Sequence, residues 1–210
     1  MKKLIVAAIM VLASFGIFAQ AGSQYFAILP GYSFSTGNYQ EATNFIYGGH
    51  LYEFRVNGSM SNNFVGSLDY GYFFTENLGM HVGYVYNAGQ FHANVHVGPY
   101  YFGDYKFDRS INLFEVGPEF VGPVGTNGQL FFQVNLGYTF GNSTPNIHTP
   151  YGDYPLGDFG TQSFAYGGAF GYRYYFNNSV GIAMQGTYHH YQHFPISDNW
   201  DARVGVTFKF

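Results

Sequence analysis

Runs of about ten residues in which apolar side chains alternate with small or polar ones recur along most of this 210-residue chain. A two-residue period is typical of a β-strand with two different faces, because successive side chains point to opposite sides. The run from Leu130 to Phe140 is the clearest. Pro118 interrupts another run, and because proline has no N–H to donate, we expect a bulge or a strand end there. The pattern predicts eight strands, at residues 26–34, 64–74, 78–86, 114–120, 130–140, 164–176, 180–191 and 200–210.

The N-terminus has the composition of a secretory signal peptide. Two lysines precede an apolar run from Leu4 to Phe18, and small residues follow it. We expect cleavage before Gly22, with Ala19 and Ala21 in the two positions that a signal peptidase reads, and cleavage directly after Ala19 is the alternative. The predicted organisation is therefore a signal peptide over residues 1–21 and one exported domain over residues 22–210.

The composition is unusual for a soluble domain. Aromatic residues make up 22% of the chain and charged residues only 10%, and there is no cysteine, whereas a soluble domain carries about 25% charged residues. The lack of cysteine excludes disulfides and thiolate chemistry. Acidic residues outnumber basic ones, 12 to 8, which argues against a nucleic-acid partner. A surface so poor in charge does not suit water.

Short connections alternate with long ones between the predicted strands. The short ones are rich in Asn and Gly, as hairpin turns are. Strand-like pieces on both sides of Asn57-Gly58 leave a ten-stranded arrangement open, but we favour an outward extension, since one more crossing would put the C-terminus on the wrong side. The short connections lie at 75–78, 122–128 and 177–179, and the long ones at 35–63, 88–109, 141–163 and 192–199.

These features predict an all-β fold, an eight-stranded antiparallel up-and-down transmembrane β-barrel. Strands of about 9–11 residues cross a bilayer when tilted, and the sheet must close on itself because every backbone amide needs a partner inside lipid. The first strand then pairs with the last, which explains why the alternation runs through Phe210. A secreted β-sandwich is disfavoured, because its outer faces would carry Lys, Glu and Asp.

The C-terminal segment carries a more specific pattern. Arg203, Gly205, Phe208 and Phe210 fill the four defined positions of the series polar, any, Gly, any, any, aromatic, any, aromatic. This series resembles the assembly signal of bacterial outer-membrane barrels, and Gly71–Tyr86 resembles a hairpin of OmpA/OmpX/OmpW-type barrels. The resemblance implies an outer-membrane location, with membrane lipid and the barrel-assembly machinery as partners. It implies no particular activity.

Several charged side chains fall on the less apolar face, which would line a narrow lumen. Acidic and basic groups there are expected to pair, because an unpaired buried charge is costly. The main expectation is an interior that these groups help to fill, and the alternative is a gate or ion path. We expect Asp201 nearer the outer rim. The predicted lumen charge network comprises Asp69, Glu115, Glu119, Arg173, Arg203 and Lys209.

Histidines are the other candidates for chemistry, because neighbouring imidazoles can bind a metal. Alternation, however, turns His189 inward and His190 outward, and the segment with His92 and His96 does not look helical. We therefore expect surface or interfacial histidines and no metal or cofactor site.

The predicted function is structural and interactive: an outer-membrane scaffold whose long extracellular loops meet a ligand outside the cell. A small pore or conduit for apolar or small solutes is the alternative. A lipid A-modifying enzyme is less favoured. Barrel-type deacylases have a His followed two residues later by a nucleophilic Ser, whereas Tyr191 follows His189 and Gln192 follows His190 here. We therefore expect no catalytic residues.

Overall fold

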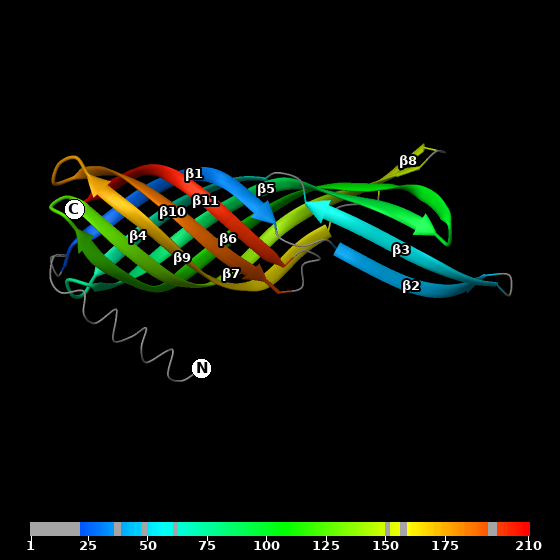
Figure 1. The fold of residues 1–210 in the computed structure, drawn as a ribbon, viewed down its shortest axis with the longest axis horizontal. Coiled ribbons are helices and arrows are strands. Elements are labelled where there is room, and N and C mark those ends of the chain that lie inside the picture. Colours follow the sequence, from blue (N-terminus) through cyan, green and yellow to red (C-terminus); the bar gives the residue numbers. More distant parts are fainter. Residues whose placement is uncertain are drawn as a thin grey trace, which may run out of the picture.

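Eight strands close into an antiparallel barrel, and three more extend the sheet beyond one end of it (Figure 1). The structure is a computed structural model and describes residues 22–35, 39–47, 50–60, 63–149, 152–155, 159–192 and 197–210. The expected signal peptide, with Ala19 and Ala21, lies outside these residues. The barrel strands are β1 (Gln24–Ser35), β4 (Asn63–Phe73), β5 (Leu78–Val97), β6 (Tyr100–Val124), β7 (Gly128–Thr149), β9 (Phe159–Tyr175), β10 (Val180–Tyr191) and β11 (Asp198–Lys209).

The barrel closes where β1 pairs with β11, as the sequence predicts. Ile28 lies opposite Val206 and Phe26 opposite Phe208. At the end of this seam the backbones of Gln24 and Phe210 exchange two hydrogen bonds, of 3.2 and 2.9 Å. The alternation continues to Phe210 because its backbone completes the seam.

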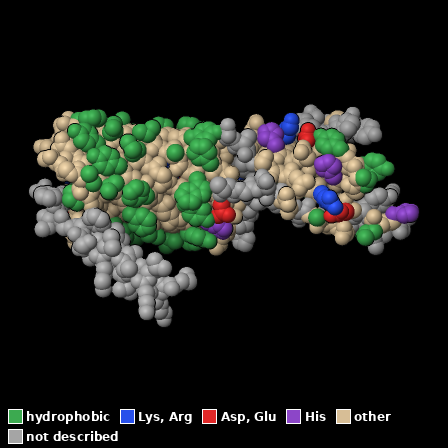
Figure 2. All heavy atoms as spheres, viewed as in Figure 1, with side chains coloured by type: hydrophobic (Ala, Val, Ile, Leu, Met, Phe, Trp, Pro, Cys, Tyr) green, Lys and Arg blue, Asp and Glu red, His purple; other side chains and the backbone are tan. Residues whose placement is uncertain are grey.

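The two faces of the barrel strands differ in exposure, as the alternation predicts. Burial alternates residue by residue along β4 and β10. Outward side chains are large and apolar, and Val204, Phe170 and Leu136 each remain at least half exposed. Figure 2 shows apolar side chains spread over the barrel, whereas the visible charged and histidine side chains gather over the extension and its junction with the barrel. An apolar outer belt of this kind suits lipid rather than water.

Beyond the barrel rim the sheet continues as a second region, here called the outer sheet. It comprises β2 (Tyr39–Tyr47), β3 (His50–Met60) and β8 (Gly152–Pro155). It also includes the part of β5 after Gly89, the part of β6 before Arg109 and the part of β7 after Gly141. The β2–β3 hairpin pairs with the outer part of β5, and β8 pairs with β7. The strand order across it is therefore β2-β3-β5-β6-β7-β8 (Figure 1).

The outer sheet has a small apolar core of its own. Phe91 and Ala93 are buried, and Val56 and Tyr105 pack against them. The rings of Phe91 and Tyr105 meet edge to face, with centroids 6.3 Å apart. This packing explains why residues that we expected to be long connections are largely strand.

Two details of the sequence prediction are wrong. Asn57-Gly58 is not a turn: both residues lie inside β3, opposite Gln40 and Tyr39. Pro118 causes neither a bulge nor a strand end. β6 runs on to Val124, and its register with β7 is the same on both sides of the proline, so only the local pairing with β7 is interrupted. The outward extension at residues 35–63, in contrast, is confirmed.

Candidate functional site

One cluster in the barrel interior surrounds an ion pair. Arg173 Nη1 lies 2.5 Å from Glu119 Oε1, and both side chains are almost completely buried. The Arg173 guanidinium also lies over the rings of Tyr25 and Phe131, at 3.7 and 4.0 Å from their centroids. Tyr25 donates its hydroxyl hydrogen to Glu119, and Gln133 donates a hydrogen bond of 2.8 Å to the same carboxylate. Strands β1, β6, β7 and β9 therefore meet through one carboxylate.

A second cluster surrounds His189, nearer the outer rim. Its Nε2 lies 2.9 Å from Glu115 Oε2, and its Nδ1 lies 3.3 Å from Asp201 Oδ2. Asn135 donates a 3.0 Å hydrogen bond to Glu115, and Arg203 forms a 2.5 Å ion pair with Asp201. All these charged groups are buried. The imidazole thus bridges two carboxylates that come from β6 and β11.

The remaining predicted lumen charges occupy different positions. Asp69 is buried and accepts a 2.9 Å hydrogen bond from Ser67. Lys209 shares the inward face but lies at the mouth of the barrel, with its Nζ 5.8 Å from the centre of the Tyr175 ring. It therefore lies apart from the other predicted charges. Asp201, which we expected nearer the outer rim, is buried beside Arg203 and belongs to the His189 cluster.

Sequence reasoning missed several interior groups. His189 was expected at the surface or at the membrane interface, but it is 1% exposed. Its odd position in β10 already turned it inward, so alternation was a usable signal. Tyr25 offered no such signal, because β1 is apolar on both faces and periodicity does not mark its inner one. Arg109 is also buried, at the outer end of the barrel, with its guanidinium 5.8 Å from the centre of the Tyr191 ring.

A layer of amide and hydroxyl groups lies across the outer end of the barrel. Asn199 donates to Ser33 at 2.5 Å, and Asn87 donates to the same hydroxyl at 3.0 Å. Ser35 donates to Asn199 at 2.6 Å. Next to this layer lies an apolar cluster of buried side chains, namely Val65, Val85, Ile111, Leu113, Ala165 and Tyr191.

The outer sheet presents several large exposed side chains and one exposed ion pair. Leu51, Tyr100 and Tyr101 are exposed by 69%, 75% and 52%. Glu53 and Arg55 form an exposed 2.5 Å ion pair, and the hydrogen bond from Arg55 lowers the pKa of the Glu53 carboxyl. The ladder leaves one long edge, β2, which pairs with β3 on one side and with nothing else among the residues that the structure describes.

Neither a helical membrane span nor a metal site emerges from the described part of the chain. It contains no helix long and apolar enough to cross a bilayer. Across the same residues, no group of three or more His, Asp or Glu side chains could hold a metal ion.

Comparison with known proteins identifies the fold but no relative in sequence. No protein-family model and no curated protein matches the chain. The structure is similar to OprG of Pseudomonas aeruginosa, with a TM-score of 0.54, 12% identity, and coverage of 91% of this chain and 97% of that one. It is also similar to Ail of Yersinia pestis in complex with the heparin analogue sucrose octasulfate, with a TM-score of 0.52, 14% identity, and coverage of 91% of this chain and 100% of that one. The chain has the fold of a bacterial outer-membrane β-barrel.

A third similar structure is the outer-membrane protease OmpT of Escherichia coli, with a TM-score of 0.50, 9% identity, and coverage of 93% of this chain and 99% of that one. At such identities the likeness concerns the fold. Together with the apolar belt of this barrel, it places the protein in the outer membrane, with lipid around strands whose outward side chains include Val204 and Phe170.

Three of the residues that resemble an assembly signal lie in β11, the last strand of this barrel, and Phe210 follows it directly. The Arg203 side chain is buried, Gly205 is partly buried, and Phe210 is 74% exposed. Phe208 pairs with Phe26 of β1 and with Val180 of β10. The segment therefore forms one side of the closing seam, and its reading by the assembly machinery remains a prediction.

Proposed function

We propose that the protein is a membrane-anchored scaffold that presents the outer sheet for recognition outside the cell. The observation that carries this proposal is the continuity of the outer sheet with the barrel wall. β5, β6 and β7 pass from one to the other without a break, and the outer sheet adds its own core around Phe91. A recognition surface built on paired strands is held more rigidly than one built on separate loops.

The interior supports a scaffold rather than a conduit. Buried side chains occur at successive levels, from the Arg173–Glu119 pair through the His189 cluster to the amide layer around Ser33. We propose that these groups form a plug that fixes strand register and closes the lumen. An eight-stranded barrel is narrow enough for side chains to fill it.

We expect the reconstituted protein to give no reproducible channels in planar bilayers. The Arg173–Glu119 pair and the amide layer around Ser33 lie across its interior. The measurement is single-channel recording over many insertions. Stable conductance steps of one size would support the alternative, a small pore, and would contradict the proposed plug.

The charge of the outer sheet limits the ligands that we consider. Ail is known in complex with a sulfated heparin analogue, and a sulfated polyanion needs a cluster of Lys and Arg. The strands of the outer sheet contain two basic residues of this kind, Arg55 and Lys106, and Arg55 is already paired with Glu53. A protein segment suits this surface better than a sulfated glycan does.

We propose strand β2 as the element that such a segment contacts, through strand addition at its open edge. Natural edge strands are usually protected by proline, lysine, a bulge or short length. β8, at the opposite edge, has only four residues and ends at Pro155. β2 has nine residues, with neither proline nor lysine among them. Within the described strands, one edge of the outer sheet is thus protected and the other is left open.

The substitution Asn44→Pro tests the role of the β2 edge. Proline removes one backbone N–H and resists pairing inside a strand. We expect cells that display the wild-type protein to attach to epithelial cells or to one another several-fold better than cells without it, and Asn44→Pro to abolish most of that gain. The measurement is attachment per cell, with equal amounts of folded protein in the outer membrane.

Asn94→Pro, inside β5 of the outer sheet, is a control that disturbs an interior strand rather than an edge. A loss with Asn94→Pro alone, while Asn44→Pro behaves like wild type, would assign recognition elsewhere on the outer sheet. Equal attachment with and without the protein would refute the surface role itself.

We also propose that the barrel-assembly machinery inserts the chain through Arg203, Gly205, Phe208 and Phe210.

We further propose that the protein is not an enzyme. The arrangement of the histidines supports this proposal. His189 is enclosed between two carboxylates, and His190 Nδ1 lies 2.9 Å from Asp198 Oδ1 at the outer rim. Ser197 donates its weak 3.4 Å hydrogen bond to Asp198.

A further inference from the structure

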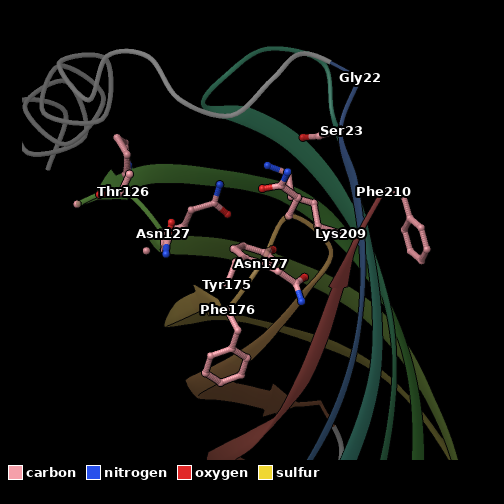
Figure 3. A pocket seen from close by; sticks show the side chains of 14 residues that line it. Gly22, Ser23, Thr126, Asn127, Tyr175, Phe176, Asn177, Lys209 and Phe210 are labelled. Atoms are coloured by element: carbon pink, nitrogen blue, oxygen red, sulfur yellow. The ribbon is translucent and has the colours of Figure 1, made fainter.

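The barrel end that holds the two ends of the described chain, which we expect to face the periplasm, has a pocket of about 930 Å³ between the turns after β6 and β9 (Figure 3). We call it the mouth pocket. Its polar and charged lining residues are Ser23, Thr126, Asn127, Gln129, Asn177, Asn178 and Lys209. Glycines, Pro123 and aromatic residues complete the lining. We propose that the mouth pocket binds a peptide segment that bears a free carboxylate, with Lys209 as the cation that receives it.

Buried side chains close the inner side of the mouth pocket. Inward side chains of one level, Gln129 and Lys209 among them, line the mouth. One step deeper along β7 and β9 lie Phe131 and Arg173, both about 2% exposed. Because the Arg173 guanidinium lies over the Phe131 ring at 4.0 Å, this level is tightly packed. A ligand can enter from the periplasmic side and stop at this layer.

The charge of the mouth pocket favours an anion. Lys209 is the one charged side chain among its described lining residues, which include no Asp or Glu. Its ammonium lies 5.8 Å from the centre of the Tyr175 ring, and a cation near an aromatic ring is attracted by the ring face. In Figure 3, Lys209 and Asn127 reach into the pocket, whereas the rings of Phe176 and Phe210 point away from it.

The amide groups around Lys209 favour a peptide rather than a bare ion. Asn177 Oδ1 already accepts hydrogen bonds from the backbone N–H groups of Ser179 and Val180, at 2.9 and 2.8 Å. Its Nδ2 group is therefore left to donate. Asn127 and Gln129 add two more side-chain amides, which can both donate to and accept from a peptide backbone. The volume far exceeds that of one carboxylate and lies in the usual range for small-ligand sites, about 300–1,000 Å³.

The test uses two probes that differ in one group. N-acetyl-alanyl-alanine with a free carboxylate and the same dipeptide with a C-terminal amide are titrated into the full barrel in detergent micelles, and the side-chain amide signals of Asn127, Gln129 and Asn177 are followed by NMR. We expect saturable shifts with the acid, and binding weaker by about tenfold or more with the amide, the usual cost of losing a hydrogen bond to a charged group.

Lys209→Gln is expected to weaken binding of the acid by a similar factor, whereas Lys209→Arg retains it. Lys106→Gln, which removes a cation from the outer sheet, is the matched control and is expected to bind like wild type. Equal binding of acid and amide by the wild-type protein would overturn the proposal even if Lys209→Gln fails to fold. Unchanged binding of the acid by folded Lys209→Gln would overturn it as well.

Discussion

Replacing Arg173 by Met is expected to destabilise the barrel by about 3–5 kcal/mol, the usual cost of removing one partner of a buried ion pair. Glu119 would stay fully buried and keep only the hydrogen bonds from Tyr25 and Gln133. The guanidinium also fills the space between the rings of Tyr25 and Phe131, so packing is lost with the charge. The measurement is urea-induced unfolding in lipid vesicles, followed by the fluorescence of Trp200, the single tryptophan.

A double variant separates the charge effect from the packing effect. Arg173→Met with Glu119→Met removes both charges, and we expect it to recover much of the lost stability, because apolar groups of similar size often replace a buried pair at little cost. Lys209→Met is the control for removing a cation at the mouth of the barrel. A single Arg173→Met variant as stable as wild type would show that the Glu119 carboxylate does not depend on this partner.

Gly205→Ala is expected to prevent closure of the barrel. A Cβ atom at residue 205 would lie 1.9 Å from the carbonyl oxygen of Ile28 and 3.0 Å from Cα of Leu29, both backbone atoms of β1. The two strands of the seam would have to move apart, and overpacking of this kind costs about 1–3 kcal/mol or more. The measurement is gel mobility with and without boiling: we expect the compact band of unboiled wild-type protein to be strongly reduced.

Gly186→Ala on β10 is the matched control, because the nearest atom to its added Cβ is 3.9 Å away. Refolding of urea-unfolded protein into detergent distinguishes two causes of a Gly205→Ala defect, since no assembly machinery is present there. Failure to refold in detergent agrees with a blocked seam. Normal refolding in detergent, with failure only in cells, would contradict the steric account and place the defect in recognition of the assembly signal.

Alternation predicted the barrel strands well because it is a local property. The inward position of Glu115, the outward position of Val204 and the pairing of the first strand with the last all follow from a two-residue period and from the need to pair every amide in lipid. The same alternation continues in β5 through Phe91, Ala93 and Val95. The strand character of the outer sheet was therefore partly predictable from the sequence, although we expected a long connection there.

The contacts inside the barrel were not predictable in this way. Arg173 and Glu119 come from β9 and β6, which are separated by β7, and His189 and Glu115 meet across the interior from β10 and β6. Which inward residues share a level depends on the stagger between strands, and alternation contains no information on stagger. For the same reason the sequence did not separate Lys209, at the mouth, from Arg173, one level deeper.

The sequence by itself determined that this chain forms a closed, lipid-facing sheet, because the period of its side chains and its scarcity of charge suit no other environment so well. Only the tertiary structure decided which charges meet, that β2 is an open edge among the described strands, and that Lys209 lies in a pocket lined by side-chain amides. Each of these depends on the register between strands, which is set by the packing of the whole barrel and not by any one strand.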